Sequence, residues 1–303
     1  MKKVIYIILG LLLILVAFNF SKIKLGYIYY VSPCYYGEPI RQNHFPQVFL
    51  EVDLPSYYEE IQNLAQLNFK IDTLETVSYK NNNYPILELT KSTYNSEAKK
   101  LLIIAAVHGN ESAGALAIPE LLKEVNTNAD RFKNWNLKII TPVNPVGLLA
   151  MSRYNASGCD LNRKFNSSNE KGVTVQKNTI DNYNPDVIIN LHESPASGFL
   201  IHSNSILPNE LLFKILNDVE SKGVTLSVED YFGRKLETAG NSKISGVLKF
   251  LNKVVKVEAL GDYVTKKNII EITTESGWNS SDEFQRINSH LYTILSVVDN
   301  YKL

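Results

Sequence analysis

The stretch of sequence that decides the fold is Leu101-Leu102-Ile103-Ile104-Ala105-Ala106-Val107-His108-Gly109-Asn110-Glu111. Its first seven residues form a short, continuous apolar run, which predicts a buried strand that ends at His108. Residues 186–192 repeat the pattern as DVIINLH and predict a second strand that ends at His192. Because open α/β sheets bind ligands at the carboxyl ends of their parallel strands, we expect the two histidines to meet there.

These two strand ends carry the residues of a metal site. His108 and Glu111 form a His-x-x-Glu pair, and His192 adds a second imidazole. Two imidazoles and one carboxylate are the protein ligands of a catalytic zinc site that keeps its fourth position open. A lone His-x-x-Glu pair occurs by chance in many proteins, so the prediction depends on the strand context. The sequence predicts a hydrolase that binds one zinc ion through His108, Glu111 and His192.

Strands and helices alternate along the rest of the chain. We expect further strands at 137–142, 254–259 and 269–274, a hairpin at 76–90, and helices at 57–67, 111–125, 209–222 and 281–301. This order predicts an α/β fold with a mixed, mostly parallel central sheet covered by helices on both faces. The 303 residues are 45% hydrophobic, which is enough for a substantial core. Lys plus Arg total 31 and Asp plus Glu total 31, so the overall charge gives no reason to expect a nucleic acid partner.

The amino-terminal part differs in composition from the rest. Residues 4–20 are uncharged and mostly aliphatic, and as a helix they reach roughly 26 Å, near the lower limit for crossing a membrane. A small-residue cleavage site does not follow them, so we expect an uncleaved single-pass anchor in the cytoplasmic membrane rather than a cleaved signal. Lys2 and Lys3 favour the cytoplasmic side, which places the catalytic domain outside the cytoplasm. Residues 1–20 are thus the predicted anchor, 21–54 a stem and 55–303 the catalytic domain.

Cys34 and Cys159 are the two cysteines of the chain. An extracytoplasmic location permits a disulfide between them. Their distance in sequence gives no geometry, so free thiols and a disulfide are both open.

The segment NPVGLLAMSRYNASGCDLNRKF at 144–165 makes the interpretation more specific. An HGNE strand end, then NPxG, an arginine, DLNR and a later strand that ends in histidine resemble the zinc carboxypeptidase superfamily in its broad sense. The segment is most similar to the bacterial murein peptide amidase and carboxypeptidase branch, and the aspartoacylase and succinylglutamate desuccinylase branch shares DLNR. Val146 stands where an Asp is common and Lys164 where an Asn is common, which blurs the branch. The resemblance covers about 57–303.

The resemblance implies roles for individual residues. The zinc ligands would be His108, Glu111 and His192. Arg153 would polarise the scissile carbonyl. A carboxylate of the substrate would be held by Asn162 and Arg163. The chemistry agrees, since a guanidinium grips a carboxylate through two parallel hydrogen bonds and a second one near zinc stabilises a developing oxyanion.

The same resemblance requires a carboxylate that takes a proton from water and returns it to the leaving amine. Glu271 lies in the predicted strand 269–274, and Glu275 directly follows it. Because the two residues are four positions apart, they point to the same face if the strand continues. We expect Glu275, at the carboxyl end, to be the base and Glu271 to be structural. Tyr231 and Tyr263 are both open as the tyrosine that covers the substrate.

Three other polar residues near these motifs are expected outside the metal site. Glu193 follows His192 directly and points to the opposite face if the strand continues. His202 follows an apolar run but has no carboxylate at ligand spacing, so we expect a structural role. His290 lies among polar residues of the last predicted helix, and we expect it to be solvated.

The expected function is a zinc-dependent metallocarboxypeptidase or peptide amidase that hydrolyses an amide bond next to a free carboxylate in cell-wall (murein) peptides. The expected partners are this peptide or muropeptide substrate and, through residues 4–20, the membrane. One alternative is an N-acyl amino acid deacylase of the aspartoacylase type, which performs the same chemistry on a small metabolite. A further alternative is a binding protein that has lost catalysis.

Overall fold

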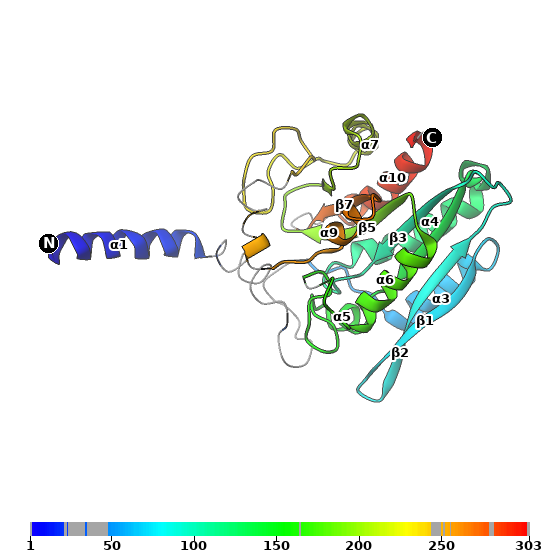
Figure 1. Ribbon diagram of the computed structural model, residues 1–303, viewed down its shortest axis with the longest axis horizontal. Coiled ribbons are helices and arrows are strands. Elements are labelled where there is room, and N and C mark those ends of the chain that lie inside the picture. The colour runs from blue at the N-terminus through cyan, green and yellow to red at the C-terminus, as the bar shows by residue number, and fades with distance from the viewer. Residues whose placement is uncertain are drawn as a thin grey trace.

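The computed structural model describes residues 2–20, 23, 34, 48–163, 165–243, 250, 252–254, 256–278 and 282–301. Helix α1 (Lys2–Phe18) has 17 residues and lies apart from the α/β domain (Figure 1). Within the described ranges, no helix is both long enough and apolar enough to cross a membrane. The predicted anchor is therefore not supported, because the helix ends at Phe18, before the apolar run does. The predicted stem at 21–54 lies mostly outside the described residues.

A seven-stranded sheet in the order β1-β2-β4-β3-β5-β7-β6 forms the centre of the domain (Figure 1). The strands are β1 (Lys70–Tyr79), β2 (Asn82–Lys91), β3 (Lys99–Ala105), β4 (Trp135–Thr141), β5 (Val187–Ser194), β6 (Leu200–Ser203) and β7 (Ile270–Gly277). The four central strands β4, β3, β5 and β7 are parallel. β1, β2 and β6 pair antiparallel at the two edges. The predicted mixed sheet is confirmed, with its parallel strands at the centre.

Helices cover both faces of this sheet. One face packs against α3 (Leu54–Ala65), α4 (Ala113–Thr127), α7 (Asn209–Ser221) and α10 (Glu283–Asn300), and the other against α6 (Lys171–Tyr183) and α9 (Leu260–Thr265). A short helix α5 (Pro145–Ala150) and a 3-10 turn η1 (Ala129–Phe132) complete the domain. In β3, Leu101 and Ile103 pack into the first hydrophobic cluster, whereas Leu102 and Ile104 pack into the second. Burial on both faces explains why residues 101–105 of this strand are all apolar.

The strand predicted at 254–259 is wrong. Residues 252–254 are helical, and Ala259 is the N-cap of α9. Glu258 pairs instead with the loop that carries Arg163: its N–H donates to the Arg163 carbonyl at 2.8 Å, and its carbonyl accepts from the N–H of Phe165 at 2.7 Å. The β-branched segment therefore hydrogen-bonds to the loop of Arg163 and does not pair as a strand of the sheet.

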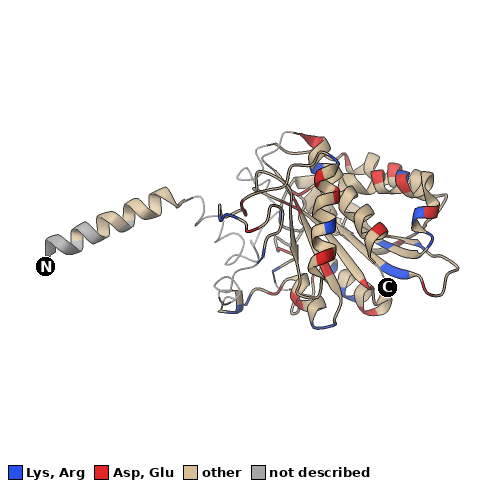
Figure 2. Ribbon diagram, turned by 90° about the horizontal axis from the view of Figure 1, so that it is seen from above, with Lys and Arg blue, Asp and Glu red and all other residues tan. Residues whose placement is uncertain are grey.

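Cys34 and Cys159 form a disulfide, which decides between the two states left open by the sequence. The bond joins the segment after α1 to the residue directly before Asp160. Figure 2 shows that acidic and basic residues are interspersed along the helices and loops of the domain, in keeping with their equal numbers in the sequence.

Candidate metal centre

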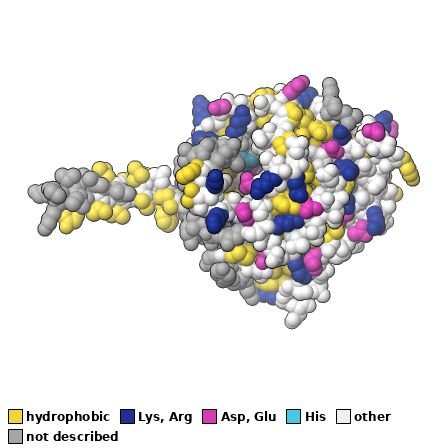
Figure 3. Space-filling model, in the orientation of Figure 1, with side chains coloured by type: hydrophobic (Ala, Val, Ile, Leu, Met, Phe, Trp, Pro, Cys, Tyr) yellow, Lys and Arg dark blue, Asp and Glu magenta, His cyan; other side chains and the backbone are white. Residues whose placement is uncertain are grey.

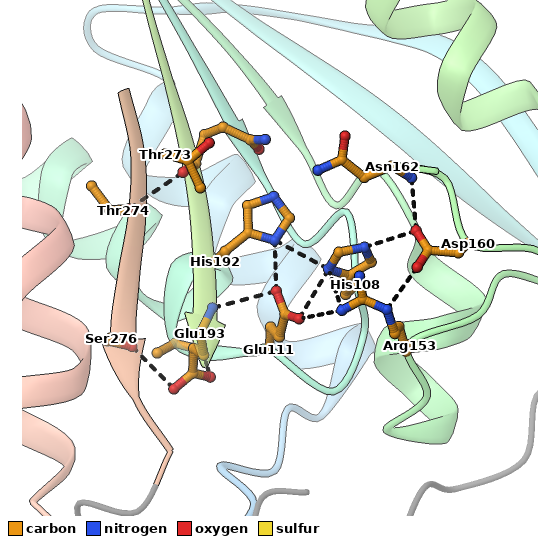
Figure 4. A network of polar contacts seen from close by, with 12 residues as sticks. His108, Glu111, Arg153, Asp160, Asn162, His192, Glu193, Thr273, Thr274 and Ser276 are labelled. Carbon is orange, nitrogen blue, oxygen red and sulfur yellow. Dashed lines mark hydrogen bonds and ion pairs between the residues drawn. The ribbon is translucent and has the colours of Figure 1, made fainter. Parts of the chain in front are cut away.

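Three side chains converge at the carboxyl edge of the parallel strands. His108 follows β3, Glu111 precedes α4 and His192 lies in β5. The Nδ1 atom of His108 is 2.9 Å from Glu111 Oε1, and Nδ1 of His192 is 2.6 Å from Glu111 Oε2 (Figure 4). The two Nδ1 atoms are 3.1 Å apart, and all three side chains are buried. The structure thus brings together the three residues that the sequence proposed as metal ligands.

The protonation pattern of this cluster fits a metal ion. Nε2 of His108 lies 3.1 Å from a carboxylate oxygen of Asp160. A carboxylate accepts hydrogen bonds, so this contact places the proton of a neutral His108 on Nε2 and leaves a lone pair on Nδ1. That lone pair faces Nδ1 of His192 and the carboxylate of Glu111, an arrangement that a cation between them would stabilise. Two nitrogens and one carboxylate oxygen are donors that suit zinc.

Glu111 is charged within this cluster. Burial alone would raise the pKa of its carboxyl group, but the neighbouring His108 and His192 outweigh burial and lower the pKa. Burial lowers the pKa of His192, which favours the neutral imidazole that a metal needs. The electrostatics therefore keep the carboxylate and His192 in their metal-binding forms.

Asp160 is a site residue that sequence reasoning did not single out. One of its oxygens contacts His108, and the other accepts from Nε of Arg153 at 2.7 Å (Figure 4). Burial would raise the pKa of Asp160, but Arg153, Arg163 and His108 hold it well below its usual value. Carboxylates that orient a metal-binding histidine fix its tautomer and raise its basicity. Its place in the DLNR motif, two residues before Asn162, is the signal that marks it.

Arg153 lies next to the candidate ligands. Its Nη1 atom is 3.0 Å from Glu111 Oε1, and its side chain is buried. The contact with Asp160 fixes the guanidinium from the other side. Arg153 is therefore a buried cation next to the candidate ligands, and its role towards a substrate carbonyl stays a prediction.

Asn162 and Arg163 line the same cavity as the cluster. Oδ1 of Asn162 accepts from the backbone N–H of Leu260 at 2.8 Å, so the amide nitrogen of Asn162 faces away from this contact as a donor. Nη1 of Arg163 donates to the carbonyl of Asn162 at 2.8 Å. α9 and the loop residue Glu258 therefore hold both predicted carboxylate-binding residues in place.

The two candidate bases of β7 have different surroundings. Glu275 pairs in register with His192 and lines the cavity, whereas Glu271 is not among the described residues that line it. Burial, then the charge of Glu111, raises the pKa of Glu275 well above its usual value. Glu271 is buried and accepts a hydrogen bond from the hydroxyl of Thr273. Of the two glutamates, Glu275 is thus the one in the described cavity wall, and its role as base stays a prediction.

The cavity in front of the cluster has a volume of about 150 Å³. Its wall also includes His202, Tyr231 and Ser242. Tyr263 lies elsewhere, with its ring 5.4 Å from that of Phe165. Of the two tyrosines left open by the sequence, Tyr231 is the one in the cavity wall.

A histidine side chain is visible on one face of the domain among acidic and basic side chains (Figure 3).

Glu193 of β5 and His290 of α10 both have side-chain partners outside the ligand cluster. Glu193 accepts from Nε of Arg286 at 2.8 Å and from the N–H of Ala113, so it points away from the ligand cluster, as expected. The expectation that His290 is solvated is wrong. Its side chain is fully buried, its Nδ1 lies 2.8 Å from the hydroxyl of Thr274, and burial lowers its pKa to about 3.

Two glycines allow the HGNE and NPVG segments to approach each other. A Cβ atom on Gly109 would lie 1.8 Å from the backbone carbon of Gly147. The N–H of Gly109 donates to the carbonyl of Ser152 at 2.8 Å. Only a residue without a side chain fits this contact, which sets His108 beside the loop of Arg153.

Comparison with solved structures identifies the fold. A metallopeptidase candidate from Shewanella denitrificans has 18% identity and a TM-score of 0.64, covering 82% of this chain and 95% of its own. A metallo-carboxypeptidase from Burkholderia cenocepacia has 17% identity and a TM-score of 0.62, and the match covers 84% of this chain and 71% of that protein. Bovine thrombin-activatable fibrinolysis inhibitor has 15% identity and a TM-score of 0.60, and the match covers 83% of this chain and 97% of that protein. The fold is that of the zinc carboxypeptidases.

The sequence comparisons add a second relationship. Residues 97–196 match the family described as the succinylglutamate desuccinylase/aspartoacylase catalytic domain. No curated protein sequence matches the chain. The predicted resemblance to the broad zinc carboxypeptidase superfamily is confirmed, whereas its murein branch is not.

Removing a ligand should remove the metal. His108→Ala and His192→Ala each delete one of three candidate donors, so we expect a zinc content well below one ion per chain after dialysis. Asp160→Asn keeps the donors but weakens the orientation of His108, and we expect a zinc affinity about 10–100-fold lower. Metal analysis and competition with a chelating dye measure both, with His202→Phe as a control that retains zinc. Undiminished zinc in both alanine variants would rule out this ligand set.

Glu271 should make stability depend on pH. Burial raises the pKa of Glu271 from 4.5 to about 7 in the folded protein. Its protonated form is therefore favoured by folding, and this stabilisation is present below pH 4.5 and lost as the pH rises through 7. We expect Glu271→Gln to reduce the difference in unfolding free energy between pH 5 and pH 8 by about 2–3 kcal/mol. Urea unfolding of both proteins at the two pH values tests this, and an unchanged difference contradicts it.

Proposed function

We propose that the protein is a zinc-dependent hydrolase that cuts an amide bond next to a free carboxylate, as a carboxypeptidase or peptide amidase does. The observation that carries the proposal is one cavity that combines the His108–Glu111–His192 cluster with Glu275 and Arg163. The cluster supplies a metal site, and the other two residues supply a base and a carboxylate-binding cation.

The residues of the site divide the reaction between them. A zinc ion held by the cluster would lower the pKa of water to about 7 and polarise the scissile carbonyl. Glu275 takes the proton from the attacking water and passes it to the leaving nitrogen. Burial raises the pKa of Glu275, and a carboxylate with a raised pKa is a stronger base towards the attacking water.

The two arginines act at different points of the substrate. Arg153, buried against Glu111 and Asp160, donates to the oxygen that becomes negative in the transition state. Arg163 pairs with the free carboxylate beside the bond that is cut, and the amide nitrogen of Asn162 adds a donor.

A second candidate function is the removal of an acyl group from an N-acyl amino acid. The match of residues 97–196 to the desuccinylase and aspartoacylase family favours it. Both reactions cut an amide whose nitrogen belongs to a residue with a free carboxylate. They differ on the acyl side, which is a peptide in one case and a small acid in the other.

We further propose that the domain works outside the cytoplasm, on cell-wall peptides. The disulfide between Cys34 and Cys159 supports this location, because disulfides persist in oxidising compartments and are rare in the cytosol. Murein peptides present free carboxylates in that compartment.

The test is incubation of the zinc-loaded protein with three substrate classes: purified muropeptides, acylated dipeptides and short N-acyl amino acids. We expect cleavage of the first two, loss of cleavage with a chelator, and products whose masses show the release of one residue with a free carboxylate. Cleavage of N-acyl amino acids alone would select the second function. No release from any class would leave the fold as a binding protein.

A further inference from the structure

His202, on strand β6, lines the same cavity as the metal cluster. In the antiparallel pair of β6 and β7, His202 is directly opposite Thr273, two residues before Glu275. Directly opposite residues of such a pair point to the same face, as do residues two apart in one strand. His202 and Thr273 therefore lie one layer of side chains deeper than Glu275, and both line the cavity.

The tautomer of His202 follows from its contact with Ser242. Nδ1 of His202 is 2.9 Å from the backbone carbonyl of Ser242. A carbonyl oxygen only accepts, so Nδ1 carries the proton. Burial lowers the pKa of His202 to about 4, which keeps the ring neutral at pH 7. Nε2 of His202 is consequently a hydrogen-bond acceptor without a proton.

Two polar atoms of His202 and Ser242 are buried with no partner among the residues that the structure describes. These are Nε2 of His202 and the hydroxyl oxygen of Ser242. The hydroxyl of Thr273 is already used to donate to Glu271, so its oxygen offers lone pairs alone. Leaving a buried polar group unpaired costs about 1–3 kcal/mol, so a ligand that pairs with these atoms gains this energy.

We propose that His202, Ser242 and Thr273, here called the polar floor, determine specificity by binding a neutral side chain that donates hydrogen bonds. This side chain belongs to the residue released by the reaction, so the inference rests on the proposed function and adds its substrate class. Threonine, serine, asparagine and glutamine carry such side chains.

The surroundings of the polar floor disfavour other side chains. An apolar group would bury Nε2 of His202 and the Ser242 hydroxyl unpaired. A carboxylate would bring its lone pairs against the lone pair of Nε2. Arg234 and Lys243 line the same cavity, so a cationic side chain would meet like charge there. The carboxylate of Asp230 would not offset this charge, because it is already paired with Arg234 at 2.9 Å.

The test compares substrates that differ only in the released residue. Acylated dipeptides ending in threonine and valine have the same shape, as do those ending in asparagine and aspartate. We expect kcat/KM to be at least tenfold higher for threonine than for valine, and for asparagine than for aspartate. Ratios near one in both pairs, with clear cleavage, would overturn the inference and leave the proposed function standing.

Two variants assign the effect to the polar floor. His202→Phe keeps a ring of similar size and removes both nitrogens, and Ser242→Ala removes one hydroxyl while the backbone carbonyl remains. Each should bring the threonine-to-valine ratio towards one, and a zinc content and thermal unfolding close to wild type would show that the variant is folded and metal-loaded. If His202→Phe does not fold, as thermal unfolding would show, Ser242→Ala decides alone. Unchanged ratios in the folded variants would overturn the assignment.

Failure of the proposed function has a separate signature. If no dipeptide is cut, a glycine-ending one included, the reaction class is wrong. Calorimetric titration of the zinc-loaded protein with free threonine, valine, asparagine and aspartate then tests the polar floor without turnover. Tighter binding of threonine and asparagine than of their isosteres, lost in Ser242→Ala, supports the polar floor. Equal or undetectable binding of all four overturns it.

Discussion

Glu275→Gln is expected to lower kcat by about 10²–10⁴-fold while the zinc content stays at the wild-type level. Glutamine has nearly the same shape as glutamate but cannot accept a proton from water at neutral pH. Glu275 does not belong to the ligand cluster, so the metal has no reason to leave. Steady-state kinetics on the best acylated dipeptide, together with metal analysis of the same sample, measure both quantities.

Glu271→Gln is the matched control for this experiment. It makes the same chemical change on the same strand, four residues away and outside the described cavity wall. We expect its kcat within about tenfold of wild type, since it removes no acid or base from the site. The reverse pattern, a large loss in Glu271→Gln and a small one in Glu275→Gln, would move the role of base to Glu271.

The centre of the fold and the candidate ligands were predictable because burial on both faces leaves a clear sequence pattern. Residues 101–105 of β3 and 187–189 of β5 are apolar and buried, as expected for central parallel strands. Their carboxyl ends lie at one edge of the sheet, which brings His108 and His192 within hydrogen-bonding distance. A local pattern was sufficient here because β3 and β5 are parallel neighbours, and this pairing places their carboxyl ends side by side.

The edges of the fold left weaker patterns. β6 has four residues, too few to show alternation, and α6 carries its buried Val173, Val175 and Ile180 among threonines and asparagines with low helix propensity. The valines at 254–257 suggested a strand, but Glu258 pairs with the loop of Arg163 instead. In all three segments, contacts with distant parts of the chain outweigh the local preference.

His290 shows why polar neighbours do not predict exposure. Ser289 and Thr293, on either side of it, are fully buried because their hydroxyls donate to backbone carbonyls of the same helix. Such side chains need no water and pack as small apolar groups do. The polarity of α10 therefore gave no sign that His290 lies against β7. Asp160 is similar, since its contact with His108 spans 52 residues of sequence.

Arg163 should distinguish free-acid from amidated substrates. A guanidinium in the cavity wall, held by the carbonyl of Asn162, pairs with a carboxylate through charge and parallel hydrogen bonds. Amidating the substrate removes the negative charge, so the Arg163 cation no longer meets a carboxylate of the bound ligand. Removing one member of a buried charge pair costs about 2–5 kcal/mol.

We therefore expect wild-type kcat/KM to be at least tens of times lower for an amidated dipeptide than for the free acid. Arg163→Ala should slow the free acid by a similar factor and leave little preference between the two. Arg234→Ala, which removes another arginine of the same cavity wall, should keep the preference. Equal wild-type rates on both substrates would exclude a carboxylate-binding role and indicate an enzyme that cuts within the peptide chain.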